Sequence, residues 1–299
     1  MTETTVPGSA TRRVVAIVNP ATRRSPGPIV TLLRDLAPAG TVVSVWQTTG
    51  AGTTTEIARR SLQGADLMIA VGGDGTVAAV ASAIDGSGIP LGIVPAGSTN
   101  IIARELGIPT NARAAVSLLY GAHRRHDLDL GVCGESRFLH MAGAGLDSRL
   151  FAATNPGLKR KVGWLAYLPA GARNLVEPPV RFTIQADETT IEVVSPLVLV
   201  ANGGSVIAPG LTLYPGIRKD DGLLDVLVFT PRGPVQIART LGRAATRGLA
   251  HSPFVLRIPA HRVEITTDPP IPVQLDGDVA TMTPATFEIR PGAIHVVTP

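Results

Sequence analysis

The stretch VGGDGTVAAVASAI, residues 71–84, places an unusual turn between a strand and a helix. Residues 67–71 (LMIAV) form an apolar run of strand length, and an alanine-rich helix is predicted from Val77 onward. The glycines around Asp74 leave backbone N–H groups bare at a helix N-terminus, where the helix dipole favours phosphate. Asp74 and Thr76 supply the oxygen ligands that Mg²⁺ takes. The stretch is therefore interpreted as a nucleotide triphosphate site.

Simpler interpretations of this turn stay open. Glycine permits a tight connection between strand and helix, and Asp74 is a favoured residue at the start of a helix. Neither better-known phosphate-binding pattern fits, because no lysine follows the glycines as in G-x-x-x-x-G-K-[ST], and the spacing G-x-G-x-x-G is missing. A third class of phosphate site is indicated.

The composition indicates a folded protein with two domains. The chain has 299 residues, of which 44% are hydrophobic and 17% charged, enough for a core and unlike a disordered chain. The net charge of +4 and pI near 9.7 suit a nucleotide or an anionic membrane surface. A nucleic-acid partner is not expected, because aromatic residues make up only 4% of the chain and no basic helix with interleaved aromatic residues is found in the sequence.

Neither a targeting signal nor a membrane-spanning segment is expected in this sequence. Cys133 is the single cysteine, which excludes a disulfide within the chain and indicates a reducing compartment. Residues 1–13 lack the apolar centre of a signal peptide, and no run approaches the roughly 20 apolar residues of a spanning helix. We expect a cytoplasmic protein whose membrane contact is peripheral.

Short apolar runs alternate with helical stretches in the first part of the chain, which predicts βαβ units and a mostly parallel sheet. Ligands of such sheets bind at the carboxyl ends of the strands, where small polar or turn residues follow each run here. The strands are predicted at residues 14–18, 41–46, 67–71 and 91–94, and further helices near 29–36 and 54–63.

Beyond about Arg125 the pattern changes to short strand-like runs separated by turn residues, which predicts an antiparallel sandwich or barrel. Two helices are expected to interrupt them, at residues 158–175 and 234–247. The runs are 126–132, 136–145, 180–186, 189–194, 196–202, 222–229, 254–258, 261–266, 271–275, 285–290 and 293–297.

Eight motifs span nearly the whole chain, and each is weak alone. They are VGGDGT (71–76), IVPAGSTNIIAR (93–104), DLDLG (127–131), FLHMAGAGLDS (138–148), LKRKVGWLAYLPAG (158–171), VANGG (200–204), RKDDGLLDV (218–226) and LDGD (275–278). Taken together and in this order, they resemble the diacylglycerol kinase catalytic-domain family of bacterial lipid kinases, diacylglycerol kinases and sphingosine kinases.

The resemblance implies an N-terminal three-layer α/β nucleotide-binding domain and a C-terminal antiparallel β-sandwich. Their expected bounds are residues 1–125, with 286–299 returning to the first domain, and residues 126–285. The implied activity is that of a transferase of lipid metabolism and phospholipid biosynthesis, which moves the γ-phosphate of ATP, with Mg²⁺, to the hydroxyl of diacylglycerol or a related lipid at a membrane surface.

The resemblance also assigns nucleotide-binding positions. Ser98 stands where threonine is common in the family, and both residues offer a hydroxyl. The full set is Asn19, Thr48, Gly72, Gly73, Asp74, Gly75, Thr76, Gly97, Ser98 and Asn100.

Carboxylates for catalysis and for Mg²⁺ are carried over in the same way. Asp276 and Asp278 match the family's D-G-E motif, whose final acid is taken as the general base, and which of the two reaches the acceptor hydroxyl stays open. Ile101 replaces an aspartate of many bacterial members, so Asp74 and Asp129 remain for the catalytic Mg²⁺ network. A structural Mg²⁺ is implied at Asp221 and the carbonyls of Arg218 and Leu223.

Alternative interpretations accompany these motifs. LDGD also reads as a hairpin turn, and DDGLLDV as a strand that is entered through a turn. Along HDLDLG, strand alternation puts His126 on the face opposite Asp127 and Asp129, which disfavours a zinc site. Residues 158–171 carry Lys159, Arg160 and Lys161 beside two aromatic residues, which fits an anionic membrane surface or a solvated helix start.

Two rival functions remain. A NAD kinase shares the glycine turn, but its family places an Asn-Glu pair where this chain has Asn100 without a following acid. A non-catalytic lipid-binding protein of the same fold would not require Asp74, Asp276 and Asp278. The sequence leaves open which lipid is used and whether the chain forms a homodimer.

Overall fold

The computed structural model describes residues 12–22, 24–50, 52–145, 179–205, 213–231, 235–236, 239–240, 243, 249–250 and 252–299. The chain divides into two compact units: unit 1 comprises Met1–Gly97, Leu106–His126 and His295–Pro299, and unit 2 comprises Ser98–Glu105 and Asp127–Ile294. Compared with the expected domains, residues 98–105 group with unit 2, and only residues 295–299 return to unit 1.

Unit 1 is built on a parallel sheet with the strand order β2-β1-β3-β4-β16, as the alternation of strands and helices predicts. Only the end of β16 belongs to this unit, and Val296 pairs with Leu91 of β4. The elements are β1 (Arg12–Val18), α1 (Pro26–Asp35), β2 (Thr41–Gln47), α2 (Thr53–Arg60), β3 (Leu67–Gly72), α3 (Asp74–Ile84), β4 (Leu91–Pro95) and α5 (Ala112–Tyr120).

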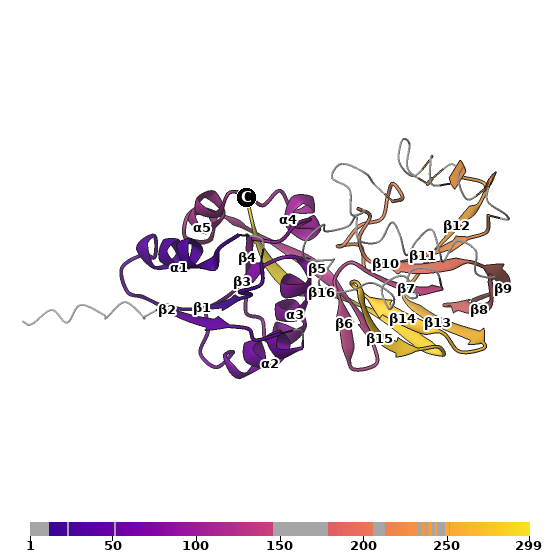
Figure 1. Cartoon of the computed structure of the whole chain (residues 1–299), viewed down its shortest axis with the longest axis horizontal. Helices are drawn as coiled ribbons and strands as arrows, with labels where there is room; N and C mark the ends of the chain where they lie inside the picture. The colour runs from indigo at the N-terminus through magenta and orange to yellow at the C-terminus, as the bar shows by residue number, and fades with distance from the viewer. Residues whose placement is uncertain are drawn as a thin grey trace, which may run out of the picture. The chain divides into compact units, whose positions relative to one another are not determined.

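Helices cover both faces of this sheet, which gives the expected three layers. In Figure 1, α1 and α5 lie on one side of the strands, and α2 and α3 lie on the other. Val14, Ala16 and Val18 of β1 pack with Leu33 of α1 and Leu119 of α5 in one buried cluster. Because the strands are covered on both faces, they read as continuous apolar runs in the sequence.

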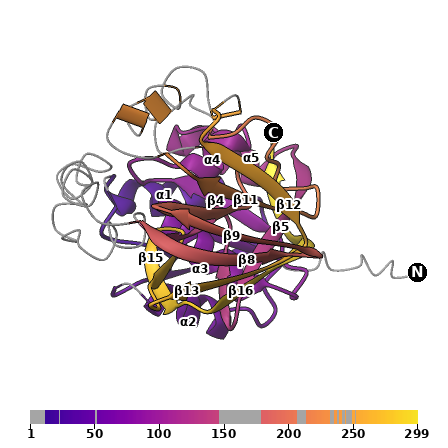
Figure 2. The same cartoon turned by 90° about the vertical axis from the view of Figure 1, so that its right-hand side faces the viewer.

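Unit 2 is an antiparallel β-sandwich that also carries the short helix α4 (Ile101–Glu105). One sheet has the order β12-β11-β10-β7-β14-β15, and the other runs from β16 through β13 and β8 to β9, with β5 on β16 and β6 on β5. Figure 2 shows β9, β8 and β13 side by side. The strands are β5 (Arg124–Cys133), β6 (Ser136–Phe138), β7 (Met141–Gly145), β8 (Val180–Ala186), β9 (Thr189–Ser195), β10 (Leu197–Ala201), β11 (Leu224–Phe229), β12 (Val255–Ala260), β13 (Arg262–Asp268), β14 (Pro272–Leu275), β15 (Asp278–Met282) and β16 (Ala285–Thr298).

The core of unit 2 lies between these two sheets. Phe182 and Ile184 of β8 and Phe287 of β16 pack against Val226 and Val228 of β11 in one buried cluster. The alternation of buried and exposed residues along β8 and β13 matches the period-two pattern seen in the sequence. Unit 2 is therefore a sandwich and not a barrel, as the family resemblance implies.

Several local differences separate the structure from the expected elements, among them the helices α4 and α5, which were not expected. The run 136–145 forms two strands, because the backbone amides of residues 139 and 140 donate to the carboxylate of Asp276 and not to a neighbouring strand. The runs 285–290 and 293–297 form the single strand β16, and β15 was not expected. The helix expected at 158–175 lies outside the described residues, as does most of the one expected at 234–247.

Within the described part of the chain, no helix has both the length and the apolar character needed to cross a membrane.

Candidate functional site

In unit 1 the expected nucleotide-binding residues follow the carboxyl ends of neighbouring parallel strands. The amide of Asn19 donates to the carbonyl of Val71 at 3.1 Å, and that of Thr48 donates to the carbonyl of Val18 at 2.9 Å. The amide of Ala96, one residue before Gly97, donates to the carbonyl of Gly72 at 2.8 Å. These bonds bring Asn19, Thr48 and Gly97 to the same sheet edge as the glycine turn.

The glycine turn packs too closely for a side chain at Gly72 and leaves little room for one at Gly73. A Cβ added to Gly72 would lie 2.3 Å from Oγ1 of Thr76, and one added to Gly73 would lie 3.2 Å from Cα of Gly97. A Cβ on Gly75 would meet nothing within 4 Å, so the chain at Gly75 faces open space. Gly72 and Gly73 therefore allow the turn to pack closely against Thr76 and Gly97, and Gly75 leaves the helix start accessible.

Thr76 and Asn19 meet beside this turn. The side-chain Nδ2 of Asn19 donates to Oγ1 of Thr76 at 3.3 Å. Its Oδ1 accepts from the backbone amide of Ala21 at 2.9 Å. Thr76 is buried, whereas Asp74, the first residue of α3, is partly exposed. An acidic side chain at this helix start is favoured by the dipole and can still reach solvent or a ligand.

The donor set of this site fits Mg²⁺ bound together with phosphate. In the parts that the structure describes, no three His, Cys, Asp or Glu side chains are grouped to hold a metal ion by themselves. Protein Mg²⁺ sites commonly use only one or two carboxylates and complete the shell with water and phosphate oxygens. Asp74 can supply such a carboxylate, and the accessible helix start can receive the phosphates.

We expect the variant Gly72→Ala to be less stable by about 1–3 kcal/mol, because the new methyl group overlaps Thr76 and the turn has to shift. Urea unfolding measures the difference. The matched variant Gly75→Ala adds the same methyl group where no atom lies within 4 Å, and its midpoint should stay at or above that of the unmodified protein. Equal midpoints for unmodified protein and Gly72→Ala would contradict the packing argument.

Ser98 and Asn100, the other expected nucleotide-binding residues, belong to unit 2 and immediately precede α4. Ser98 is exposed, and Asn100 is buried with a left-handed φ of 48°. Asparagine tolerates this conformation better than most residues do. The carbonyl of Asn100 accepts from the amide of Arg104 at 3.1 Å, so Asn100 starts the helix.

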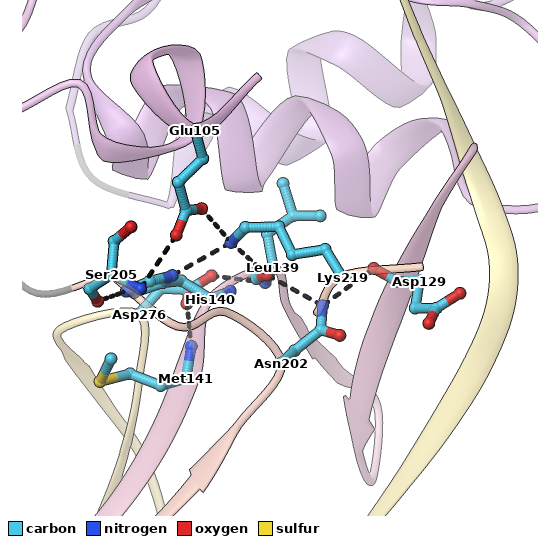
Figure 3. Close-up of polar contacts among 9 residues, drawn as sticks. All are labelled: Glu105, Asp129, Leu139, His140, Met141, Asn202, Ser205, Lys219 and Asp276. Carbon is cyan, nitrogen blue, oxygen red and sulfur yellow. Dashed lines mark hydrogen bonds and ion pairs between the residues drawn. The ribbon is translucent and has the colours of Figure 1, made fainter. Parts of the chain in front are cut away.

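The acid turn, residues 275–278, is anchored in unit 2 by the carboxylate of Asp276 (Figure 3). Its Oδ2 accepts from the amide of Leu139 at 2.7 Å, and its Oδ1 accepts from those of His140 and Met141 at 2.9 and 3.0 Å. Three successive amides directed at one carboxylate form an anion-binding nest. We call residues 139–141 the amide corner.

The two carboxylates of the acid turn differ in their surroundings. Burial raises the pKa of Asp276 above its ordinary value, and the amides and the Lys219 charge only partly offset this. Asp276 also has a left-handed φ of 48°, as expected in a hairpin turn. Asp278 begins the edge strand β15 and is exposed. Asp276 therefore combines an anchored position with a raised pKa, whereas Asp278 is accessible.

Asp129, expected in the Mg²⁺ network, lies buried and tied to the backbone. Its Oδ2 accepts from the amide of Gly222 at 2.7 Å, and its Oδ1 accepts from that of Gly292 at 2.8 Å. Asn202 donates from Nδ2 to the carbonyls of Asp129 and Leu139 at 3.0 and 2.9 Å. Asp129 thus joins β5 to two distant segments of unit 2, and a metal role for it stays a prediction.

The segment expected to hold a structural Mg²⁺ forms a loop before β11, in which Arg218, Asp220 and Asp221 are exposed and Lys219 is buried. Arg218 pairs with Asp220 at 2.8 Å, and Oδ1 of Asp221 accepts from the amide of Leu223 at 3.1 Å. These contacts show a local turn around Asp221, as the alternative interpretation of this motif expects. Cation binding by Asp221 and the two neighbouring carbonyls stays a prediction.

A buried polar network next to the amide corner was missed by the sequence analysis. The Nζ atom of Lys219 lies 2.8 Å from Oε2 of Glu105 and 3.1 Å from Nδ1 of His140. Glu105 also accepts from the amide of Ser205 at 3.0 Å through Oε1, and Nε2 of His140 lies 2.8 Å from the Ser205 carbonyl. Burial acts to raise the pKa of Glu105, but the adjacent ammonium of Lys219 is the largest of the contributions that lower it, and the net shift of the pKa is downward. We call these four residues the Lys219 network.

Two family models together match nearly the whole chain. The model of the diacylglycerol kinase catalytic domain matches residues 13–133, and the model of the YegS C-terminal NAD kinase beta sandwich-like domain matches residues 140–298. The first match includes the glycine turn, and the second includes the acid turn and three members of the Lys219 network.

Relatives and solved structures agree with these matches. The chain is 31% identical to "Probable lipid kinase YegS-like" of Pseudomonas fluorescens, covering 87% of each chain. It is 29% identical to "Diacylglycerol kinase" of Bacillus subtilis, covering 96% of this chain and 97% of the relative. It spans only 56% of the length of an uncharacterized Synechocystis protein that is 30% identical.

A crystal structure of a Bacillus anthracis protein matches with a TM-score of 0.79 at 24% identity, over 96% of this chain and 97% of that one, and supports the fold. The α/β unit with its glycine turn, the antiparallel sandwich and the similarity to relatives over most of the chain lead to one assignment. The chain belongs to the diacylglycerol kinase catalytic-domain family.

Proposed function

We propose that this protein is a lipid kinase that transfers the γ-phosphate of ATP to a lipid hydroxyl. The observation that carries the proposal is the glycine turn at the carboxyl ends of the parallel strands, where Gly72 and Gly73 allow close packing and Gly75 faces open space. A backbone of this kind can cradle phosphate at the start of α3. Family membership supports ATP as the phosphate donor.

The nucleotide side of the reaction is assigned to unit 1. Amides at the start of α3 bind phosphate oxygens, and Thr76 and Asn19 place polar groups beside them. Asp74 would hold Mg²⁺, directly or through water, and such an ion would supply charge neutralisation at the transferring phosphoryl group. Phosphoryl transfer depends mainly on such positioning and charge neutralisation, so this unit needs no covalent nucleophile.

The acceptor side is assigned to the acid turn of unit 2. A general base has to lie within hydrogen-bond reach of the acceptor hydroxyl, about 3 Å. Asp278 is exposed and therefore accessible to an acceptor, whereas the oxygens of Asp276 already accept three amides. We assign the base to Asp278 and an anchoring role to Asp276.

The proposed substrate is diacylglycerol or a related lipid at the surface of a membrane. One relative that matches over nearly its full length is named a diacylglycerol kinase, and another is named a lipid kinase. The proposed membrane contact is peripheral, from the cytoplasmic side. The basic segment 158–171, expected to meet anionic headgroups, lies outside the described residues.

The test is incubation of the purified protein with labelled ATP and Mg²⁺ and a panel of acceptors in mixed micelles. The panel contains diacylglycerol, a sphingoid base, ceramide, phosphatidylinositol and a polyprenol, with NAD as a separate arm. We expect label on a lipid, first of all diacylglycerol, and none on NAD. NADP formation without a labelled lipid would favour the NAD kinase alternative, and lipid binding without any transfer would favour the non-catalytic one.

A further inference from the structure

The Lys219 network lies next to the amide corner and contains one buried and one mostly buried charged group. The side chains of Lys219 and Glu105 are 8% and 17% exposed. Burying two charges is costly unless the ions are well paired and their remaining donors and acceptors are satisfied. A buried ion pair therefore often adds little to the stability of the protein. The groups around Lys219 and Glu105 indicate a different role for this pair.

The ammonium of Lys219 determines the state of the His140 ring. An ammonium carries three donors and no acceptor, so Nδ1 of His140, at 3.1 Å, has to accept. The ring proton then resides on Nε2, which donates to the carbonyl of Ser205 at 2.8 Å. A doubly protonated ring would direct a second N–H at the ammonium. Lys219 therefore holds His140 neutral, in the Nε2–H tautomer and in one orientation.

The same ammonium acts on Asp276 through one peptide group, as Figure 3 shows. The carbonyl of Leu139 accepts from Nζ of Lys219 at 3.4 Å and from Nδ2 of Asn202 at 2.9 Å. The N–H of that peptide group belongs to His140 and donates to Oδ1 of Asp276 at 2.9 Å. Hydrogen bonds at both ends of a peptide group polarise it and strengthen one another.

We infer that Lys219 is a positioning residue for the acid turn. Paired with Glu105 and bonded to His140, it holds the amide corner so that the three amides fix Asp276, and with it Asp278 two residues later, in one orientation. Glu105 is the last residue of α4, so the network also ties this helix to the corner. The expected effect of Lys219 on kcat rests on the proposed function, whereas its effect on the order of the amide corner does not.

The first test removes both buried charges together, because a single replacement would leave the other charge uncompensated. In Lys219→Met/Glu105→Gln we expect kcat to fall roughly 10- to 100-fold, with the KM for ATP changed less than about twofold. Hydrogen exchange at the amides of residues 139–141 should become faster. The control Arg262→Met breaks an exposed ion pair with Glu288 in the same unit and should change none of these quantities.

A second variant displaces Lys219 without changing any charge. A Cβ on Gly203 would lie 2.3 Å from Nζ of Lys219 and 2.4 Å from Nδ1 of His140, so Gly203→Ala should separate the two groups. We expect the same loss of kcat and the same faster exchange. The control Gly27→Ala adds a methyl group where nothing lies within 4 Å.

The ring of His140 gives a third measurement, on the unmodified protein. Two-dimensional ¹H–¹⁵N spectra of the imidazole should show a neutral ring with the proton on Nε2. An Nδ1–H or doubly protonated ring overturns the inference, as does unchanged exchange or unchanged kcat in the two folded variants. If no acceptor is phosphorylated by the unmodified protein, the proposed function fails, and exchange and the ring state still decide the role of Lys219.

Discussion

Asp74→Asn should lower the Mg²⁺-dependent turnover at least about 100-fold while the protein stays folded. The carboxylate is the metal-binding group assigned to the nucleotide side, and its loss removes charge neutralisation at the transferring phosphoryl group. Asparagine has nearly the same shape, and the Asp74 side chain is partly exposed, so packing changes little. The measurements are the rate as a function of Mg²⁺ concentration and urea unfolding.

The alternative role of Asp74, stabilising only the start of α3, predicts a different result. An acidic side chain in the first turn contributes about 0.3–1 kcal/mol through the helix dipole, and no change in turnover would accompany its loss. The control Asp35→Asn removes an exposed carboxylate at the end of α1 and should preserve both rate and stability. Near-normal turnover of a folded Asp74→Asn protein would therefore favour the helix-start role over the metal role.

The parallel sheet of unit 1 could be predicted because its signals are local. β3 is buried at all six positions and reads as an apolar run, and the glycines that follow mark its end. The single-run prediction for residues 136–145 was wrong because the break is caused by Asp276, 135 to 137 residues away in the sequence. β15 has five exposed residues and therefore lacks the alternation that marks a half-buried strand.

The candidate site shows the same division between local and long-range signals. The glycine turn could be found because its chemistry lies within a few consecutive residues. The Lys219 network could not, because Glu105 and Lys219 are far apart in sequence and a lysine next to two aspartates reads as a solvated turn. The contacts of Asp129 could not be predicted either, because its oxygens accept from the amides of Gly222 and Gly292, 93 and 163 residues away.

The largest effect in unit 2 is expected from Asp278→Asn, which should lower kcat about 100- to 10,000-fold, the range in which a general base contributes. The KM for ATP should change little, because the base acts on the acceptor proton. Stability should stay within about 0.5 kcal/mol, since the residue is exposed. Asp278→Glu restores the acid that is usual at this position in the family and should keep or raise the activity.

Asp276→Asn separates anchoring from base catalysis. An asparagine amide group would direct N–H donors at one or more of the three amides that now bind the carboxylate, so we expect a loss of about 1–3 kcal/mol in urea unfolding. The activity of the folded fraction should fall less than that of Asp278→Asn. The raised pKa of Asp276 makes the opposite assignment chemically reasonable, since a base works best with a pKa near the operating pH. Normal turnover of Asp278→Asn together with an inactive, folded Asp276→Asn would therefore show that Asp276 is the general base and that Asp278 has no catalytic role.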